Sequence, residues 1–192
     1  MTGKAVSNEK TRSTGLIFNS LLSDTRFVTG QNVFDDMAEG MNLATMDWEK
    51  FEHLIRELFE KVFGGDDVEV RVTQASRDRG VDAMVLDPDP IKGGKIVIQA
   101  KRYSNTVDVS SVRDLYGTVM NEGANKGILV TTSTFGPDAY AFASNKPLTL
   151  VNGGELLAMM KQAGKNVRID LEEARRFGLG AMAGRGAGSK SY

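Results

Sequence analysis

Three polar residues near the middle of the chain have the types and the spacing of a catalytic site. Asp82 can bind a hard cation such as Mg²⁺ through a carboxylate oxygen, and Gln99 can add a neutral oxygen ligand. Lys101 can hold a phosphate or position an attacking water. Together these groups are what metal-assisted hydrolysis of a phosphodiester requires. The same residue types also suit an ordinary hairpin with polar residues on its solvent face, which is the commoner arrangement for Asp and Lys.

A β-hairpin is the element that would bring these residues together. Two short apolar runs on either side of a loop rich in Pro, Gly and Asp predict this hairpin. With the loop centred between Pro90 and Ile91, Asp82 lies opposite Gln99, and directly opposed residues point to the same face. Lys101 is two positions beyond Gln99 and shares that face. The prediction depends on the register, because a slip of one residue would separate the three side chains.

The residues in and around the hairpin also follow an order found in a known family. Asp82 stands in Gly80-Val81-Asp82, and the second strand ends in Gln99-Ala100-Lys101-Arg102-Tyr103. Further matching stretches lie at 51–52, 112–117, 127–133 and 150–157. This order resembles the Mrr-type branch of the PD-(D/E)xK nuclease superfamily, in which Gln replaces the usual second acidic residue. The resemblance extends from about residue 46 to about residue 163.

The resemblance implies a fold, a reaction and a set of site residues. The fold would be α/β, with a restriction-endonuclease-like core in which helices flank a mixed central β-sheet. The reaction would be DNA cleavage that depends on Mg²⁺ (or on Mn²⁺ in its place), in defence against foreign or modified DNA. Asp82 would anchor the metal, Gln99 would contribute an oxygen or orient a water, and the Ala100 carbonyl would complete the shell. Lys101 would help to deprotonate or position the water.

A glutamate on the helix before the hairpin is a further metal-ligand candidate. Glu52 borders the apolar stripe of this helix, and in the superfamily a glutamate at the matching position can approach the metal. A solvated position on the flank of the helix is the equal alternative. Its neighbour His53 is expected at the surface rather than as a ligand.

Four residues near the predicted site are candidates for DNA binding. Arg77 and Arg79 lie in the polar loop that leads to Asp82, where they can contact the phosphate backbone. Two solvated loop arginines are the competing interpretation. Arg102 and Tyr103, which follow Lys101, complete the predicted set of DNA contacts.

Composition limits the classes of function. The chain has 192 residues, of which 41% are hydrophobic, so it is long enough for one ordinary domain with extensions. A net charge of −1 means that DNA affinity must come from a local patch. The absence of cysteine excludes disulfides, Cys-zinc sites and thiol nucleophiles, and it suits a reducing cytoplasm. No apolar run reaches the roughly 20 residues that span a bilayer, so no membrane partner is expected.

The pattern along the chain predicts three parts. Residues 1–45 are expected to be a flexible N-terminal arm or connector, and 46–165 the nuclease domain. Residues 166–192 are expected to be a C-terminal extension, with an edge strand at 167–171 and a flexible tail rich in Gly, Ala and Ser. Relatives usually carry a longer N-terminal region, so the chain would be the C-terminal part of such a protein or a shortened relative.

Two other functions fit the same residues. The first is a DNA-binding or assembly module whose nuclease site is inactive. The second is an effector nuclease that stays silent until it is activated, with residues 1–45 mediating oligomerisation. The expected partners are therefore DNA and, in the second case, further copies of the chain.

Overall fold

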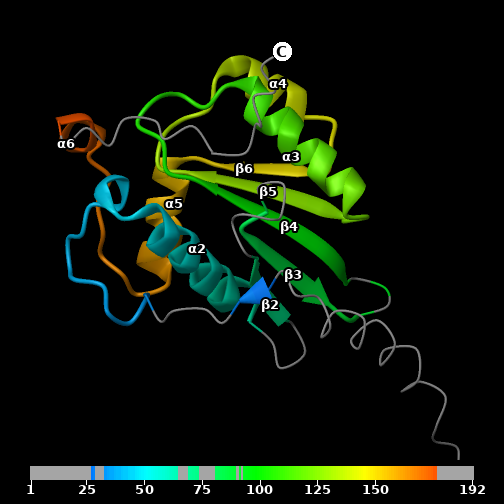
Figure 1. Ribbon diagram of the computed structural model, residues 1–192, viewed down its shortest axis with the longest axis horizontal. Coiled ribbons are helices and arrows are strands. Elements are labelled where there is room, and N and C mark those ends of the chain that lie inside the picture. The colour runs from blue at the N-terminus through cyan, green and yellow to red at the C-terminus, as the bar shows by residue number, and fades with distance from the viewer. Residues whose placement is uncertain are drawn as a thin grey trace, which may run out of the picture.

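The chain folds around a single mixed β-sheet. The computed structural model describes residues 27–28, 33–64, 69–73, 81–89, 91 and 93–176, and only the backbone at 27–28 and 69–73. Within these residues the sheet has six strands whose spatial order is their order in the sequence (Figure 1). The strands are β1 (Phe27–Val28), β2 (Glu69–Thr73), β3 (Ala83–Asp87), β4 (Gly94–Lys101), β5 (Lys126–Thr131) and β6 (Leu148–Val151).

The sheet changes from antiparallel to parallel at β4. Strands β1 to β4 pair antiparallel, whereas β4, β5 and β6 run parallel to one another. Parallel neighbours need crossover connections, which helices provide here. The predicted α/β fold, with one strand, a hairpin and two crossover units, is confirmed.

The hairpin of β3 and β4 has the predicted register along its length. Ala83 pairs with Ile98, and Asp87 pairs with Gly94. These pairs place the centre of the loop between residues 90 and 91, as the sequence predicted.

Helices begin where the sequence supplies caps. The Asp47 side chain caps α2 (Trp48–Phe63), and the Asp108 side chain caps α3 (Val109–Asn121). A capping box formed by Asn152 and Glu155 starts α5. The other helices are the 3₁₀ helix η1 (Leu43–Thr45), α4 (Pro137–Ala143), α5 (Gly153–Gln162) and α6 (Leu171–Arg176).

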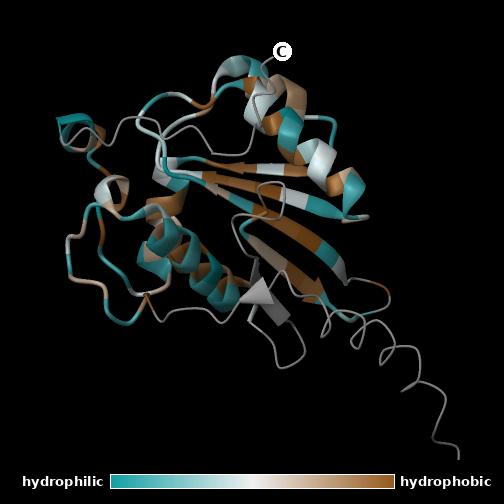
Figure 2. Ribbon diagram, viewed as in Figure 1, coloured by the Kyte–Doolittle hydropathy of each residue, from teal (hydrophilic) through white to brown (hydrophobic). Residues whose placement is uncertain are grey.

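The sheet separates two hydrophobic cores. Helices α2 and α5 cover one face, where Leu54 and Leu156 pack in one cluster with Ile98. Helices α3 and α4 cover the other face, where Leu115 packs in a second cluster with Val97. Figure 2 shows the apolar central strands between these helices. Among the helices of the described residues, none combines the length and the apolar character that a membrane crossing requires.

The packed unit is larger than the predicted nuclease domain. Phe34 and Leu43 lie before the predicted boundary at residue 46, yet they are 3% and 0% exposed and belong to the core under α2 and α5. Ala174, beyond the predicted boundary at 165, is 1% exposed. The predicted edge strand at 167–171 is wrong, because this segment forms only an isolated bridge between Arg168 and Asn42 before α6 begins.

Candidate active site

The candidate site lies where β3 begins and β4 ends. Asp82 immediately precedes β3 and is 7% exposed. Its backbone N–H donates to the Ile98 carbonyl at 3.0 Å, although Ala83 is already the partner of Ile98 in the ladder. Two consecutive residues thus face one residue of β4, which is the arrangement of a β-bulge. The predicted opposition of Asp82 and Gln99 is therefore wrong, because the bulge shifts the ladder by one residue at Asp82.

The Asp82 carboxylate is held by the backbone of β4. Its Oδ2 atom accepts a hydrogen bond from the Ala100 N–H at 2.5 Å. A residue in an extended strand directs its N–H and its C=O toward the same side of that strand. The Ala100 carbonyl therefore points to the side of β4 on which Asp82 lies, where it was predicted to join the metal shell.

Glu52 meets Asp82 from the opposing helix. It is half-buried in the second turn of α2, and a hydrogen bond joins its carboxyl group to that of Asp82. Burial raises the pKa of Glu52, and the neighbouring negative charge of Asp82 raises it further. Burial also raises the pKa of Asp82, while the Ala100 N–H and the Lys101 charge limit that rise. The pair therefore keeps a proton to higher pH than a solvated carboxyl group does, and the rise is larger for Glu52 than for Asp82.

Lys101 supplies the positive charge of the site. Its charge acts on both Glu52 and Asp82, and it is half-buried at the end of β4. Two hydroxyl groups of β5 and the following loop fix this end of the strand. Thr131 Oγ1 donates to the Lys101 carbonyl at 2.8 Å, and Thr132 Oγ1 donates to the Tyr103 carbonyl at 2.8 Å. Sequence reasoning assigned these threonines no role, although a hydroxyl-rich run directly after a buried strand was the signal.

Gln99 lies two residues before Lys101 on the same face of β4 and is 2% exposed. Within the part of the chain that the structure describes, no hydrogen bond links its amide to Glu52 or to Asp82. Its role as a metal ligand stays a prediction.

The other sequence candidates lie in different surroundings. Arg77 and Arg79 are outside the described residues. The Arg102 guanidinium donates to the Ala44 carbonyl at 2.8 Å, and half-buried Tyr103 packs against the core under α3 and α4. The expected surface position of His53 is wrong, because this side chain is 6% exposed within α2.

The donor set fits a divalent cation. The carboxyl groups of Glu52 and Asp82 are neighbours in a buried site, and both have a raised pKa, so the pair favours keeping a proton. A divalent cation could replace that proton. No group of three His, Cys, Asp or Glu side chains able to hold a metal occurs among the described residues. The predicted set adds two uncharged oxygen ligands to this pair, from Gln99 and from the Ala100 carbonyl.

The fold and the site together define a nuclease-like α/β domain, with two carboxyl groups and a lysine where β3 and β4 meet. A family model of the Mrr catalytic type, described as restriction endonuclease, matches residues 43–160, and the chain belongs to this family.

Known proteins agree with this assignment. The chain is 29% identical over 130 residues to the type IV methyl-directed restriction enzyme EcoKMrr of Escherichia coli (strain K12). The match covers 67% of this chain, and the chain spans 42% of the length of that relative.

Two solved structures align with most of this chain. The DNA modification-dependent restriction endonuclease AspBHI gives a TM-score of 0.52 at 16% identity, over 92% of this chain and 43% of that chain. The restriction endonuclease FokI gives a TM-score of 0.45 at 15% identity, over 89% of this chain and 33% of that one. The likeness to AspBHI supports the restriction-endonuclease fold.

Proposed function

We propose that this chain is a divalent-metal-dependent endonuclease that cuts DNA in defence against foreign DNA. The observation that carries this proposal is the Glu52–Asp82 carboxyl pair beside Lys101, in a chain of the restriction endonuclease family. A purely structural site gains nothing from two buried carboxyl groups in contact, because burial and like charge both oppose their ionisation.

Asp82, Glu52 and the Ala100 carbonyl would hold Mg²⁺, with Gln99 as the fourth protein ligand and Mn²⁺ as a substitute for the metal. When bound, the cation supplies positive charge that stabilises negative charge developing on the phosphate and acidifies a nearby water. The proton now held by Glu52 must leave when both carboxylates become ligands.

Lys101 would act on the phosphate and the attacking water. Its ammonium group lies close enough to both carboxylates to affect their ionisation, so it would border a phosphate held at the same place. There it can donate hydrogen bonds to a phosphate oxygen and orient the water for attack. The hydroxyl of Thr131 keeps Lys101 in position through the backbone.

The proposal also covers the kind of DNA that is cut and the compartment in which the protein acts. The relative EcoKMrr is named as methyl-directed, so we extend the proposal to DNA that carries modified bases. Arg77 and Arg79 would contact the DNA backbone near Asp82. The place of action would be the cytoplasm, which suits a chain without cysteine.

Nicking of supercoiled plasmid tests the function. We expect wild-type protein to convert methylated plasmid to open circles with Mg²⁺, and to lose this activity when EDTA removes the metal. Asp82→Ala and Lys101→Ala should each reduce the rate by at least about 100-fold, since each removes a charge that acts at the reacting phosphate.

The variants are compared at matched purity and after circular dichroism has shown that they are folded. Equal cleavage by all three proteins would show a contaminant or another site. Binding of DNA by folded wild-type protein without any cleavage, on methylated and unmethylated plasmid alike, would contradict the proposal and favour a DNA-binding module.

A further inference from the structure

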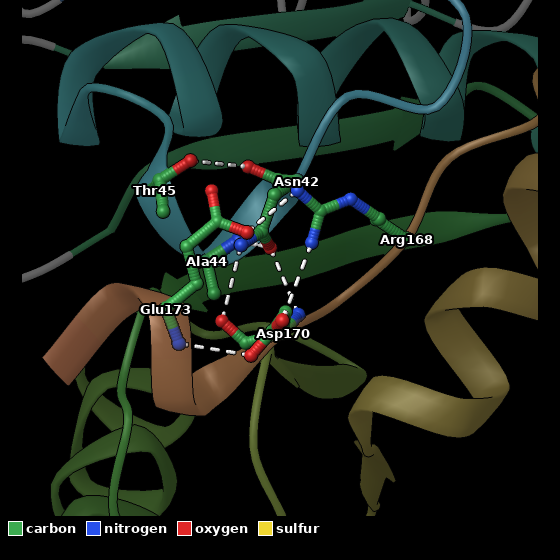
Figure 3. Close-up of polar contacts among 6 residues, drawn as sticks. All are labelled: Asn42, Ala44, Thr45, Arg168, Asp170 and Glu173. Atoms are coloured by element: carbon green, nitrogen blue, oxygen red, sulfur yellow. Dashed lines mark hydrogen bonds and ion pairs between the residues drawn. The ribbon is translucent and has the colours of Figure 1, made fainter. Parts of the chain in front are cut away.

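Two segments at the ends of the packed unit are joined to each other, and we call residues 40–45 and 166–175 the clasp. Asn42 lies at its centre, where its Nδ2 donates to the Asp170 carbonyl at 3.1 Å and its Oδ1 accepts from the Asp170 N–H at 2.9 Å (Figure 3). Backbone hydrogen bonds also cross it, from Gly40 to Asn166 (2.8 Å), from Leu43 to Arg168 (2.9 Å) and from Arg168 to Met41 (3.0 Å).

An arginine next to Lys101 reaches the N-terminal half of the clasp. Arg102 Nη1 donates to the Ala44 carbonyl at 2.8 Å, and Ala44 belongs to η1. Burial lowers the pKa of Arg102, and the negative charge of Asp47, which caps α2, opposes that shift. Arg102 therefore joins the end of β4 to η1, which precedes the helix that carries Glu52.

A second arginine reaches the same segment from the C-terminal half of the clasp. Arg175 Nη2, in α6, donates to the Ser104 carbonyl at 2.6 Å. Ser104 is 3% exposed and lies three residues beyond Lys101. The chain that leaves β4 is thus held by both halves of the clasp, and the half that contains Arg175 lies outside the residues 43–160 matched by the family.

We propose that Arg102 and Arg175 are positioning residues, which tie the segment after Lys101 to the clasp and so fix Lys101 relative to Glu52. This inference rests on the proposed nuclease function and assigns Arg102 a role other than DNA contact. The Arg102 guanidinium is half-buried, and its Nε is enclosed without a hydrogen-bond partner among the described residues. Nη1 of Arg102 already donates to the carbonyl of buried Ala44, and that acceptor would lose this partner if the side chain turned away to a DNA phosphate.

The test compares Arg102→Ala, Arg102→Lys and Arg175→Ala with the control Arg168→Ala. Arg168 forms ion pairs with Asp170 and Glu173 inside the clasp but does not hold the segment after Lys101. Each protein is assayed for cleavage rate at saturating protein, for DNA affinity without metal at several salt concentrations, and for thermal stability. Trp48, the single tryptophan and the first residue of α2, reports on this helix by its fluorescence emission.

We expect Arg102→Ala to lower the saturated cleavage rate by about 10- to 100-fold, because small misplacements of catalytic groups cost this much. Its DNA affinity and salt dependence should stay those of the wild type, and its Trp48 emission should shift. Arg102→Lys should restore most of the rate, since an ammonium can donate one hydrogen bond to the Ala44 carbonyl. Arg175→Ala should also lower the saturated cleavage rate. Arg168→Ala should keep the wild-type rate even if its melting temperature is lower.

An unchanged saturated rate in Arg102→Ala, with weaker DNA binding and a salt slope smaller by about 0.9, would overturn the inference and make Arg102 a phosphate contact. Equal losses in Arg168→Ala would overturn it too, because general destabilisation would then explain the effect. If wild-type protein does not cut DNA, the proposed function fails. In that case a Trp48 shift in Arg102→Ala that Arg102→Lys reverses still supports positioning, and an unchanged emission overturns it.

Discussion

The proton held between Glu52 and Asp82 makes the metal-free site sensitive to pH. Because the pKa of Glu52 is raised above its usual value of 4.5, the folded protein binds this proton more tightly than the unfolded chain does. The stability that comes from the proton is fully present below pH 4.5 and is lost as pH rises through the higher pKa of the folded state. The loss for one such proton is at most about 1.4 kcal/mol per pH unit.

Denaturant unfolding in EDTA between pH 5 and 8 measures this dependence. Glu52→Gln keeps a donor for Asp82 but cannot ionise, so its free energy of unfolding should fall less with rising pH than that of the wild type. Parallel curves for the two proteins would show that Glu52 does not hold the proton. Glu172→Gln, on the exposed first turn of α6, is the matched control.

The residues of the site differ in how well the sequence alone predicted their positions. The loop composition and the strand pattern predicted the hairpin that carries Asp82 and Lys101 and its register from Ala83 to Asp87. Glu52 could not be separated from a solvated residue, because its position depends on how α2 packs on the sheet. The bulge at Asp82 was not predicted either, since it arises from one hydrogen bond to Ile98 that no residue type specifies.

At the scale of secondary-structure elements, N-cap side chains determine where several helices begin. The N-cap of α3 is Asp108. Its Oδ1 atom accepts from the Ser110 N–H at 2.8 Å and from the Ser111 N–H at 3.3 Å. The hydrogen bond from the Ser110 hydroxyl is the main cause of the lowered pKa of Asp108.

Asp108→Ala should lower the free energy of unfolding by about 1 kcal/mol at neutral pH, because two N–H groups lose their acceptor. Since the folded-state pKa is lowered, the contribution of the Asp108 charge should fade as pH falls through that pKa. Thermal or urea unfolding at pH 7 and at pH 3 checks both expectations. Asp114→Ala, on the exposed face of α3, should have a smaller effect, and an equal loss would contradict the assignment.

For the whole molecule, the core extends past the domain boundary that the sequence suggested. Apolar residues between 33 and 45 lack a helical or strand period, so they gave no sign of packing. A chain that begins at residue 46 loses Phe34 and Leu43, which are 3% and 0% exposed. Their loss should cost several kcal/mol, since truncating one such side chain to Ala costs about 2–5 kcal/mol.

Thermal unfolding of chains that begin at residues 33 and 46 tests this expectation. The shorter chain should melt well below the longer one, and it should be less soluble because it exposes apolar surface under α2. Equal melting temperatures would mean that residues 33–45 are an appendage, as the sequence first indicated.

The clasp also bears on how the packed unit opens. Gly40 and Asn166 are hydrogen-bonded at 2.8 Å, so a segment that precedes α2 is held against a segment that follows α5. Segments near the ends of a domain fray unless they are tied down, and here each of the two holds the other. We therefore expect the two segments to exchange their amide hydrogens with solvent together rather than one after the other.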